Sequence, residues 1–227
     1  TWVHRGLRDG QQISAIAVDP RDPQRLFVAV LGHPYGPNTQ RGVFRSTDGG
    51  VTFQRVLYEN ENVGAYDVVV DPNDSNVAYA TLWAARQPPW ETPGAESLEV
   101  AGSGIFKSTD GGTTWQRLSN GLPPSLSRCE IAVAPSDSSV VYAYARAKDG
   151  HAAVYRSDDG GAHFVLRNAT PRIAKRGADL ASIAVDPREP NTVYVTNTST
   201  YRSTDGGRHF TAIKGAPGGD DYHAIWI

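Results

Sequence analysis

Carboxylates are the side chains of this sequence whose spacing first suggests chemistry. One aspartate recurs in a fixed phrase, Ser-x-Asp-Gly-Gly, which ends on an aromatic residue. The four copies are RSTDGGVTF (45–53), KSTDGGTTW (107–115), RSDDGGAHF (156–164) and RSTDGGRHF (202–210). Two further carboxylates, Asp67 and Glu130, stand in apolar runs. Groups of this kind can bind a cation, or act as acid and base on a glycosidic bond.

The repeated aspartates are Asp48, Asp110, Asp159 and Asp205. A catalytic group is rarely needed in four copies, whereas a short carboxylate often accepts hydrogen bonds from the backbone N–H groups of its own turn. The two glycines supply the positive φ that a tight hairpin needs. A calcium loop would need more oxygen ligands at regular spacing. The phrase therefore predicts a structural turn, with no metal and no cofactor.

Short strands must position these carboxylates. A second phrase recurs between the first ones, each time as an apolar run, a turn rich in Pro, Asp and Ser, and a second apolar run. Its copies are ISAIAVDPRDPQRLFVAV (13–30), AYDVVVDPNDSNVAYATL (65–82), RCEIAVAPSDSSVVYAYA (128–145) and LASIAVDPREPNTVYVTN (180–197). In the first repeat the expected strands, named A to D, are 13–19, 25–31, 42–47 and 51–57. Repeats of four short strands predict an all-β chain, a β-propeller with four-stranded antiparallel blades.

The repeats define the expected domain organisation. We expect a single propeller segment, 1–227, with about four complete blades. The blade repeats are about 13–57, 65–118, 128–167 and 181–213. Partial strands are expected at 1–3 and 223–227, so the segment would be a fragment with an incomplete or truncated ring.

Strand direction predicts where function lies. Because successive strands of a blade are antiparallel, the A–B and C–D turns share one end of the blade, and the B–C and D–A connections share the other. The first set is short and uniform, whereas the second is long and irregular, as in LGHPYGPNTQR (31–41). Long loops on a rigid scaffold commonly carry binding and catalysis, so we expect the site at this loop end.

Several aromatic and polar residues of these loops are candidate ligand-binding residues. His33, Tyr35, Trp83 and Trp90 could form an aromatic platform for a sugar or a peptide, or could pin the loops to the blades. A basic cluster could hold a carboxylate or phosphate or simply be solvated, and a Gly-rich turn could hold a cation or only solvate itself. The basic residues are Arg172, Lys175 and Arg176, and the residues of the turn are Asp220, Asp221 and His223.

Aligning the A strands gives the candidate catalytic pair. The equivalent positions are Ala15, Asp67, Glu130, Ser182 and Ala224, so Asp67 and Glu130 are the carboxylates of this set. Two carboxylates at a channel mouth could serve as general acid and base in glycoside hydrolysis. Alternatively, each could pair with a nearby base such as Arg128.

Composition excludes several classes of function. The formal net charge is −2, which gives no basic field for nucleic acid. No apolar run approaches the length of a membrane span. A single cysteine, Cys129, rules out an internal disulfide framework, and its apolar context predicts a small core residue.

The Ser-x-Asp-Gly-Gly phrase resembles the Asp-box, or bacterial neuraminidase repeat (BNR). This repeat occurs in sialidases, in other glycoside-hydrolase propellers and in sortilin-type receptors. The longer phrases LGHPYGPNTQRGVFRSTDGG, DPNDSNVAYATLWAARQPPW and GSGIFKSTDGGTTWQRLSNGLP are most similar to bacterial sortilin-like proteins often labelled glycosyl hydrolase. The resemblance covers nearly the whole chain and implies a secreted protein, in an extracellular or periplasmic location.

This resemblance implies non-catalytic recognition of a peptide, protein or glycan by the loop end. The alternative is a glycoside hydrolase of the sialidase or xyloglucanase-like propeller class that uses the channel-mouth carboxylates. A sialidase would carry an Arg-Ile-Pro motif, and the nearest match here, Arg172-Ile173-Ala174, lacks the proline. A third possibility is a structural module of a larger secreted assembly. The expected partners also include the remaining blades of a parent protein, or a second copy.

Overall fold

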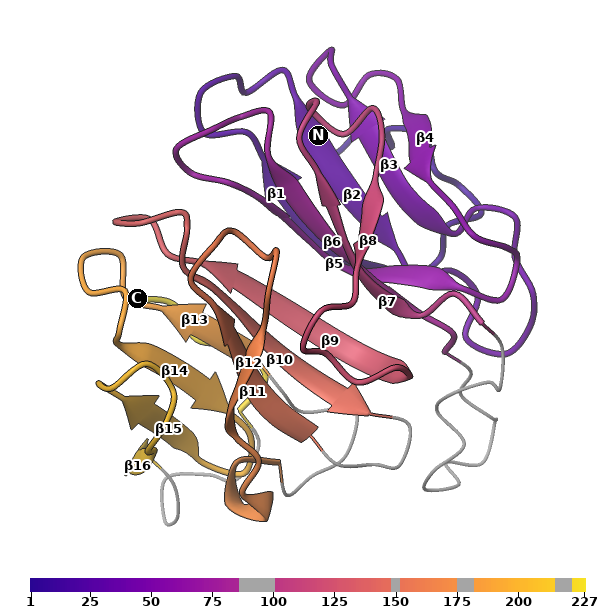
Figure 1. Cartoon of the computed structure of the whole chain (residues 1–227). Coiled ribbons are helices and arrows are strands. Elements are labelled where there is room, and N and C mark those ends of the chain that lie inside the picture. The colour runs from indigo at the N-terminus through magenta and orange to yellow at the C-terminus, as the bar shows by residue number, and fades with distance from the viewer. Residues whose placement is uncertain (86–100, 148–151, 175–181, 215–221) are drawn as a thin grey trace. The chain divides into compact units, whose positions relative to one another are not determined.

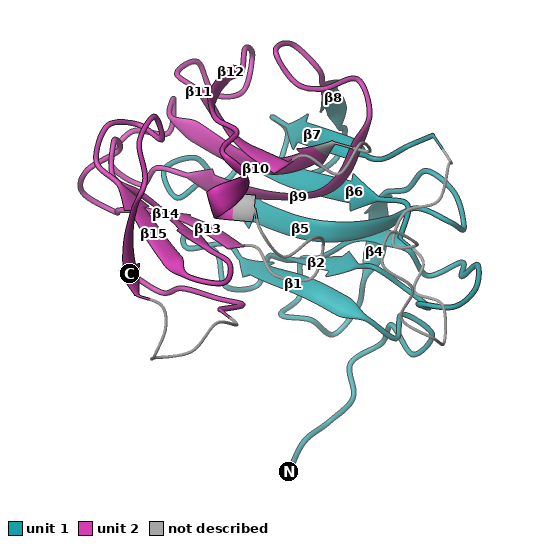
Figure 2. Cartoon of the chain, turned by 90° about the horizontal axis from the view of Figure 1, so that it is seen from below, with its two compact units in different colours: residues 1–117 teal, residues 118–227 magenta. Residues whose placement is uncertain are grey.

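The structure, a computed structural model, describes residues 1–85, 101–147, 152–174, 182–214 and 222–227. Its strands form four antiparallel sheets of four strands each (Figure 1). The chain divides into two compact units, residues 1–117 and 118–227, which Figure 2 colours separately. Each unit is described by itself below.

Unit 1 contains two sheets whose strands pair in chain order. The first sheet consists of β1 (Ile13–Val18), β2 (Leu26–Val30), β3 (Gly42–Ser46) and β4 (Gln54–Leu57). The second consists of β5 (Gly64–Val70), β6 (Ala78–Trp83), β7 (Gly104–Ser108) and β8 (Gln116–Leu118), the last of which ends just past the boundary of the unit.

Unit 2 repeats this arrangement and adds one short helix. Its first sheet consists of β9 (Leu126–Val133), β10 (Val141–Ala147), β11 (Ala152–Ser157) and β12 (Val165–Asn168). Its second sheet consists of β13 (Ser182–Val185), β14 (Val193–Thr196), β15 (Thr200–Ser203) and β16 (Thr211–Lys214). The 3₁₀ helix η1 (Pro171–Ala174) follows β12. Among the described residues, no helix is long or apolar enough to cross a membrane.

These sheets confirm the predicted fold class, an all-β chain of β-propeller blades. Each blade has the short, β-branched and aromatic strands that the repeats indicate, joined by turns rich in Gly, Pro and Asp. The strands of the four sheets span residues 13–57, 64–118, 126–168 and 182–214.

The core of each unit lies between its two sheets. In unit 1, Val68 and Val70 of β5 form one buried cluster with Phe27 and Ala29 of β2. In unit 2, Ile183 of β13 and its strand neighbours form a cluster with the β9, β10 and β11 side chains, including Tyr142 and Val154. One face of β5 and one face of β13 are therefore buried against the preceding blade.

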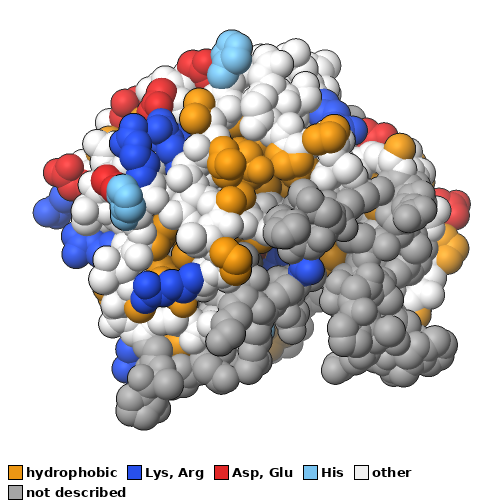
Figure 3. Space-filling view, turned by 60° about the horizontal axis from the view of Figure 1, so that its bottom comes forward, with side chains coloured by type: hydrophobic (Ala, Val, Ile, Leu, Met, Phe, Trp, Pro, Cys, Tyr) orange, Lys and Arg blue, Asp and Glu red, His pale blue; other side chains and the backbone are white. Residues whose placement is uncertain are grey.

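The side chains on the equivalent face of β1 are exposed to solvent. Ile16 is 64% exposed, whereas Val68 and Ile183, which occupy the same position in later blades, are 4% and 7% exposed. Val18 on the same face is 53% exposed. Figure 3 shows that some hydrophobic side chains are exposed on one face of the molecule. β1 thus presents, uncovered, the row of apolar side chains that β5 and β13 bury.

The turn between the third and fourth strands corrects one prediction. The fourth strand of the first blade begins at Gln54 rather than at residue 51. The reason is that the N–H groups of Val51 and Thr52 donate to the carboxylate of Asp48, so they cannot join the ladder. Gly49 and Gly50 have the predicted positive φ, but the turn between the paired residues 45 and 54 is wide rather than tight.

The two kinds of turn in each blade are also bonded to each other. The N–H of Gly49 donates to the carbonyl of Gln24 at 2.9 Å, and the same bond recurs in the other three blades. Those bonds join Gly111 to Asn76, Gly160 to Ser139, and Gly206 to Asn191. One end of every blade is therefore held by a repeated set of turn contacts.

The predicted partial strands are absent from the structure. Residues 1–3 and 223–227 carry no strand assignment, and Trp2 and Trp226 are almost fully exposed. A strand is defined by hydrogen bonds to a neighbour, and none of the described strands pairs with either segment.

Candidate functional site

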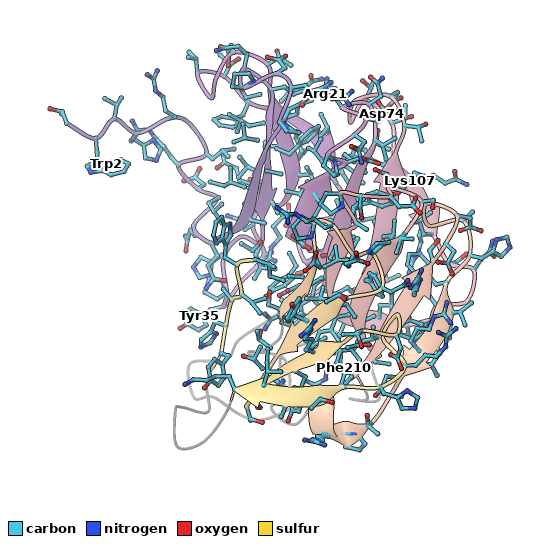
Figure 4. All side chains as sticks on the ribbon, turned by 90° about the vertical axis from the view of Figure 1, so that its left-hand side faces the viewer. Trp2, Arg21, Tyr35, Asp74, Lys107 and Phe210 are labelled. Atoms are coloured by element: carbon cyan, nitrogen blue, oxygen red, sulfur yellow. The ribbon has the colours of Figure 1, made fainter. Side chains whose placement is uncertain are left out.

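The turns and the long loops lie at opposite ends of the blades in unit 1. Figure 4 places Arg21 and Asp74, from two neighbouring A–B turns, close together at one end, and Tyr35 toward the other end. A polar chain joins these neighbouring turns, because Arg25 donates to Asp19 and to the carbonyl of Ser75. The Ser75 hydroxyl in turn donates to Asp19 at 2.7 Å.

Each Asp-box aspartate is bonded within its own turn. Asp48 accepts hydrogen bonds from the N–H groups of Val51 and Thr52, at 3.0 and 2.9 Å, and from the Thr52 hydroxyl at 2.6 Å. The Ser46 hydroxyl donates to Asp48 at 2.7 Å and accepts the N–H of Gly50 at 2.8 Å. The Thr52 hydroxyl, followed by the Thr52 N–H and the Ser46 hydroxyl, lowers the pKa of Asp48 to about 2.

Asp110, Asp159 and Asp205 likewise accept the N–H group four residues further on, which belongs to Thr114, His163 and His209. In the last two boxes a histidine replaces the threonine, and its ring nitrogen lies 3.0 Å (His163) and 2.6 Å (His209) from the carboxylate. Among the described residues, no group of His, Cys, Asp and Glu is arranged to hold a metal ion. The oxygens of these aspartates are taken up by the turn.

At the loop end of unit 1, a buried arginine shapes the loop 31–41. Arg41 is 1% exposed, and its guanidinium donates to the carbonyls of Leu31 and His33, both at 2.5 Å, and to that of Gly36 at 3.2 Å. This loop brings together two predicted site residues, because the rings of His33 and Tyr35 meet edge to face with centroids 5.9 Å apart. Tyr35 is 57% exposed, so its ring can meet a ligand.

Asp67 lies beside a bulge near the loop end of β5. The register with β6 shifts between Ala65 and Asp67, and the backbone N–H of Asp67 donates to the Thr81 hydroxyl at 3.0 Å. Bulges often re-aim side chains next to functional sites. Tyr66 packs edge to face on Trp83, with centroids 5.7 Å apart. Trp83 is 7% exposed, so most of its ring packs the loop end.

Glu130 lies on β9 in unit 2, directly opposite Tyr144 of β10. Arg128 forms an ion pair with it, with Nη2 and Oε1 3.2 Å apart. Tyr144 is buried, and its hydroxyl donates to the carbonyl of Ile173 in η1 at 2.7 Å. Burial, and then the charge of Glu130, raises the pKa of Tyr144.

The remaining predicted residues fall in three groups. Arg172 is exposed on η1, and its guanidinium carbon lies 5.4 Å from the centroid of the Tyr201 ring. His223 is exposed in a segment without strand structure. Trp90 and Arg176, together with Lys175, Asp220 and Asp221, lie outside the described residues.

The alignment of the A strands agrees with the observed register. Each aligned residue of the four sheets pairs with the equivalent position of its second strand. The pairs are Ala15 with Ala29, Asp67 with Thr81, Glu130 with Tyr144, and Ser182 with Thr196. Asp67 belongs to unit 1 and Glu130 to unit 2.

Sequence reasoning missed several residues at the loop end, among them Tyr66, Arg41 and Arg146. The role of Arg41 could have been inferred from its position at the end of a loop, just before a strand, where a buried guanidinium can donate to loop carbonyls. The roles of Tyr66 and Arg146 depend on register shifts between the first two strands of their blades, which no sequence pattern announces. Cys129 is buried, as its apolar context predicts.

Comparison with known proteins supports the Asp-box resemblance. The family model for the BNR/Asp-box repeat matches residues 106–117. A xyloglucanase from Paenibacillus sp is 28% identical over 185 residues, which is 70% of this chain and 16% of that protein. The vacuolar protein sorting/targeting protein 10 of Colletotrichum graminicola is 28% identical over 126 residues, 49% of this chain and 7% of that protein.

Among solved structures, an ancestral GH74 enzyme has a TM-score of 0.65 and 20% identity, over 92% of this chain and 26% of that one. The chain therefore spans only a minor part of these relatives. It is an all-β protein with Asp-box repeats, built from β-propeller blades, and similar both to xyloglucanases and to a vacuolar sorting protein.

Proposed function

We propose that the chain contributes blades to a propeller that binds a glycan at its loop end and, in the whole protein, hydrolyses it. The observation that carries this proposal is the similarity to a xyloglucanase, which extends over 70% of the chain. The four blades would be parts of a single propeller that acts in an extracellular or periplasmic location. This glycoside-hydrolase alternative is now better supported than recognition without catalysis.

The chemistry would rest on Asp67 and Glu130. In glycoside hydrolysis, one carboxylic acid protonates the leaving oxygen while a carboxylate activates water or attacks the sugar. The Arg128 guanidinium, 3.2 Å from Glu130, favours a charged carboxylate, which is the form of a base or nucleophile. Asp67, which is partly buried beside the bulge of β5, is the carboxylate that unit 1 would contribute.

A second candidate function is non-catalytic recognition of a peptide or protein. Two observations favour it, namely the exposed ring of Tyr35 held against His33 and the similarity to a vacuolar sorting protein. Aromatic side chains of this kind often dominate the energy of a binding interface. In this case Tyr35 would be an anchor and both carboxylates would be structural.

The two functions separate in a four-variant experiment. Turnover is measured on a soluble xyloglucan, and binding is measured on glycan and peptide arrays, for Asp67→Asn, Glu130→Gln, Tyr35→Ala and the control Asp74→Asn at the turn end. We expect turnover to fall by about 100-fold or more in both carboxylate variants, because general acid–base catalysis contributes that much. Binding should persist in them, and Asp74→Asn should behave as the wild type.

The opposite pattern would count against hydrolysis. If Tyr35→Ala abolishes binding of a peptide while both carboxylate variants keep whatever turnover the wild type has, the chain is a recognition module. If no glycan binds and none is hydrolysed, the glycan proposal fails as a whole.

A further inference from the structure

An arginine cluster lies at the loop end of unit 2, on the face of the β9–β12 sheet that packs against the β13–β16 sheet. Along β10, Tyr142 and Tyr144 belong to the core between these two sheets, and Arg146 follows at the next position of the same parity. Glu130 is opposite Tyr144 on β9, so it shares this face. The cluster therefore forms where the two blades of unit 2 meet.

The guanidinium group of Arg146 has a buried nitrogen whose hydrogen-bonding potential is not satisfied. Its Nη1 atom is buried and has no hydrogen-bond partner among the described residues. The register between β9 and β10 shifts between Ala145 and Ala147, so Arg146 lies at an irregular point of the ladder, where the Ser127 hydroxyl donates to its carbonyl. A buried charged donor without an acceptor is costly, because it loses its hydration and gains nothing.

The charge balance of the cluster favours an anion. Arg128 is paired with Glu130, and none of the ion pairs between described residues involves Arg146 or Arg172. The positive charges of Arg128 and Arg146 lower the pKa of the Tyr144 hydroxyl and so oppose the larger effect of burial. This hydroxyl donates a hydrogen bond to the carbonyl of Ile173. Arg172 precedes Ile173 directly, and its guanidinium carbon lies 5.4 Å from the centroid of the Tyr201 ring, which belongs to the core between the same two sheets.

We propose that Arg146, assisted by Arg172, binds the carboxylate of an acidic sugar, so that the glycan recognised by this protein contains uronate residues. A planar guanidinium matches a carboxylate with two parallel N–H donors, and such bonds are shorter and stronger than neutral ones. An incoming carboxylate would supply the acceptor that Arg146 Nη1 lacks. This inference rests on the proposed function, because it specifies the class of glycan.

The test compares acidic with neutral oligosaccharides of equal length. Titration calorimetry at low and high salt measures the Kd of a glucuronate-containing oligosaccharide and of a neutral xyloglucan oligosaccharide, for the wild type, Arg146→Gln and Arg172→Gln. The control is Arg202→Gln, which removes an exposed arginine near the ring of Tyr194, on another strand of unit 2. A short peptide with a free carboxyl terminus forms a third arm.

We expect the acidic oligosaccharide to bind more tightly than the neutral one, with an affinity that falls as salt rises. Arg146→Gln should weaken it roughly 10- to 100-fold, the worth of a hydrogen bond to a charged group. Arg172→Gln should weaken it less, and Arg202→Gln should leave it unchanged. The melting temperature of Arg146→Gln without ligand should stay the same or rise, since no bond to Nη1 is lost. A merely structural arginine would instead lower the melting temperature and leave the ratio of acidic to neutral binding unchanged.

Three outcomes would overturn the inference. Equal binding of acidic and neutral oligosaccharides would refute the uronate specificity while leaving glycan binding intact. Binding of the peptide alone would assign the cluster to a different class of ligand. Absence of binding to any oligosaccharide would refute both this inference and the proposed function.

Discussion

Replacing Ser108 by alanine would test the Asp-box turn at its most buried hydrogen bond. Ser108 is 1% exposed, and its hydroxyl oxygen accepts the N–H of Gly112 at 2.9 Å while its proton goes to Asp110 at 2.8 Å. Gly112 is itself buried. The variant therefore leaves a buried backbone N–H without a partner, and removes one donor from the aspartate.

The expected loss of stability is about 1–3 kcal/mol, which is the cost of a buried polar group left unsatisfied. In a chain of this length each kcal/mol lowers the melting temperature by about 2–4 °C, so we expect a fall of about 2–12 °C. Differential scanning calorimetry measures it. The control is Thr109→Ala, because Thr109 is exposed and its side chain makes no hydrogen bond to another described residue.

The reasoning also predicts repetition, since Ser46, Ser157 and Ser203 make the same bond to a glycine N–H at 2.8, 2.8 and 2.9 Å. All four serine variants should lose comparable stability without selective loss of ligand binding. If Ser108→Ala melts no lower than Thr109→Ala, or if it keeps its melting temperature and loses binding, the structural interpretation of the box is wrong.

Three further predictions concern unit 1. The pKa of Asp48 is lowered from 3.8 to about 2, so its contribution to stability is complete above about pH 4 and is lost as the pH falls toward 2; urea midpoints measured against pH should fall less steeply across this window in Asp48→Ala than in the wild type. Gly42→Ala should destabilise the protein strongly in thermal melts, because φ is +105° and a Cβ would lie 2.1 Å from the carbonyl oxygen of Leu57, whereas Gly36→Ala, with open space around it, should be neutral. Ile16→Lys should reduce concentration-dependent association in sedimentation velocity, because it charges the apolar row left open on β1, and a wild type that stays monomeric at high concentration would contradict this.

Most of the fold was predictable because the same pattern of strands and turns recurs four times in the sequence. Each repeat alone gives a weak strand signal, but four aligned copies fix the strand order, the turns and the register at Asp67 and Glu130. The start of the fourth strand was misplaced for a local reason. β-propensity favours a strand through Val51 and Thr52, yet their N–H groups are bonded to Asp48.

The site was less predictable, because its contacts depend on breaks in the strand period. Alternation places every second residue on one face, and a bulge changes that count by one. The contact of Tyr66 with Trp83 lies at such a shift, and another shift displaces the β9 residues opposite Arg146. Composition and spacing predicted the loop end and the carboxylates as candidates, and the structure adds an ion pair between Arg128 and Glu130, whose atoms lie 3.2 Å apart.

The polar groups at the two ends of a blade differ in how much hydrogen-bonding capacity they keep for a ligand. At the turn end, Asp110 already accepts the N–H groups of Thr113 and Thr114 and the Thr114 hydroxyl, so its oxygens are used within the turn. At the loop end the repeat is broken, since the positions equivalent to Asp67 include an alanine and a serine in other blades. A propeller keeps its scaffold by repetition and acquires specificity by departing from it. Asp67, a carboxylate beside a bulge, and Arg146, an arginine with a buried donor, both differ from the repeat. The functional tests therefore change these side chains.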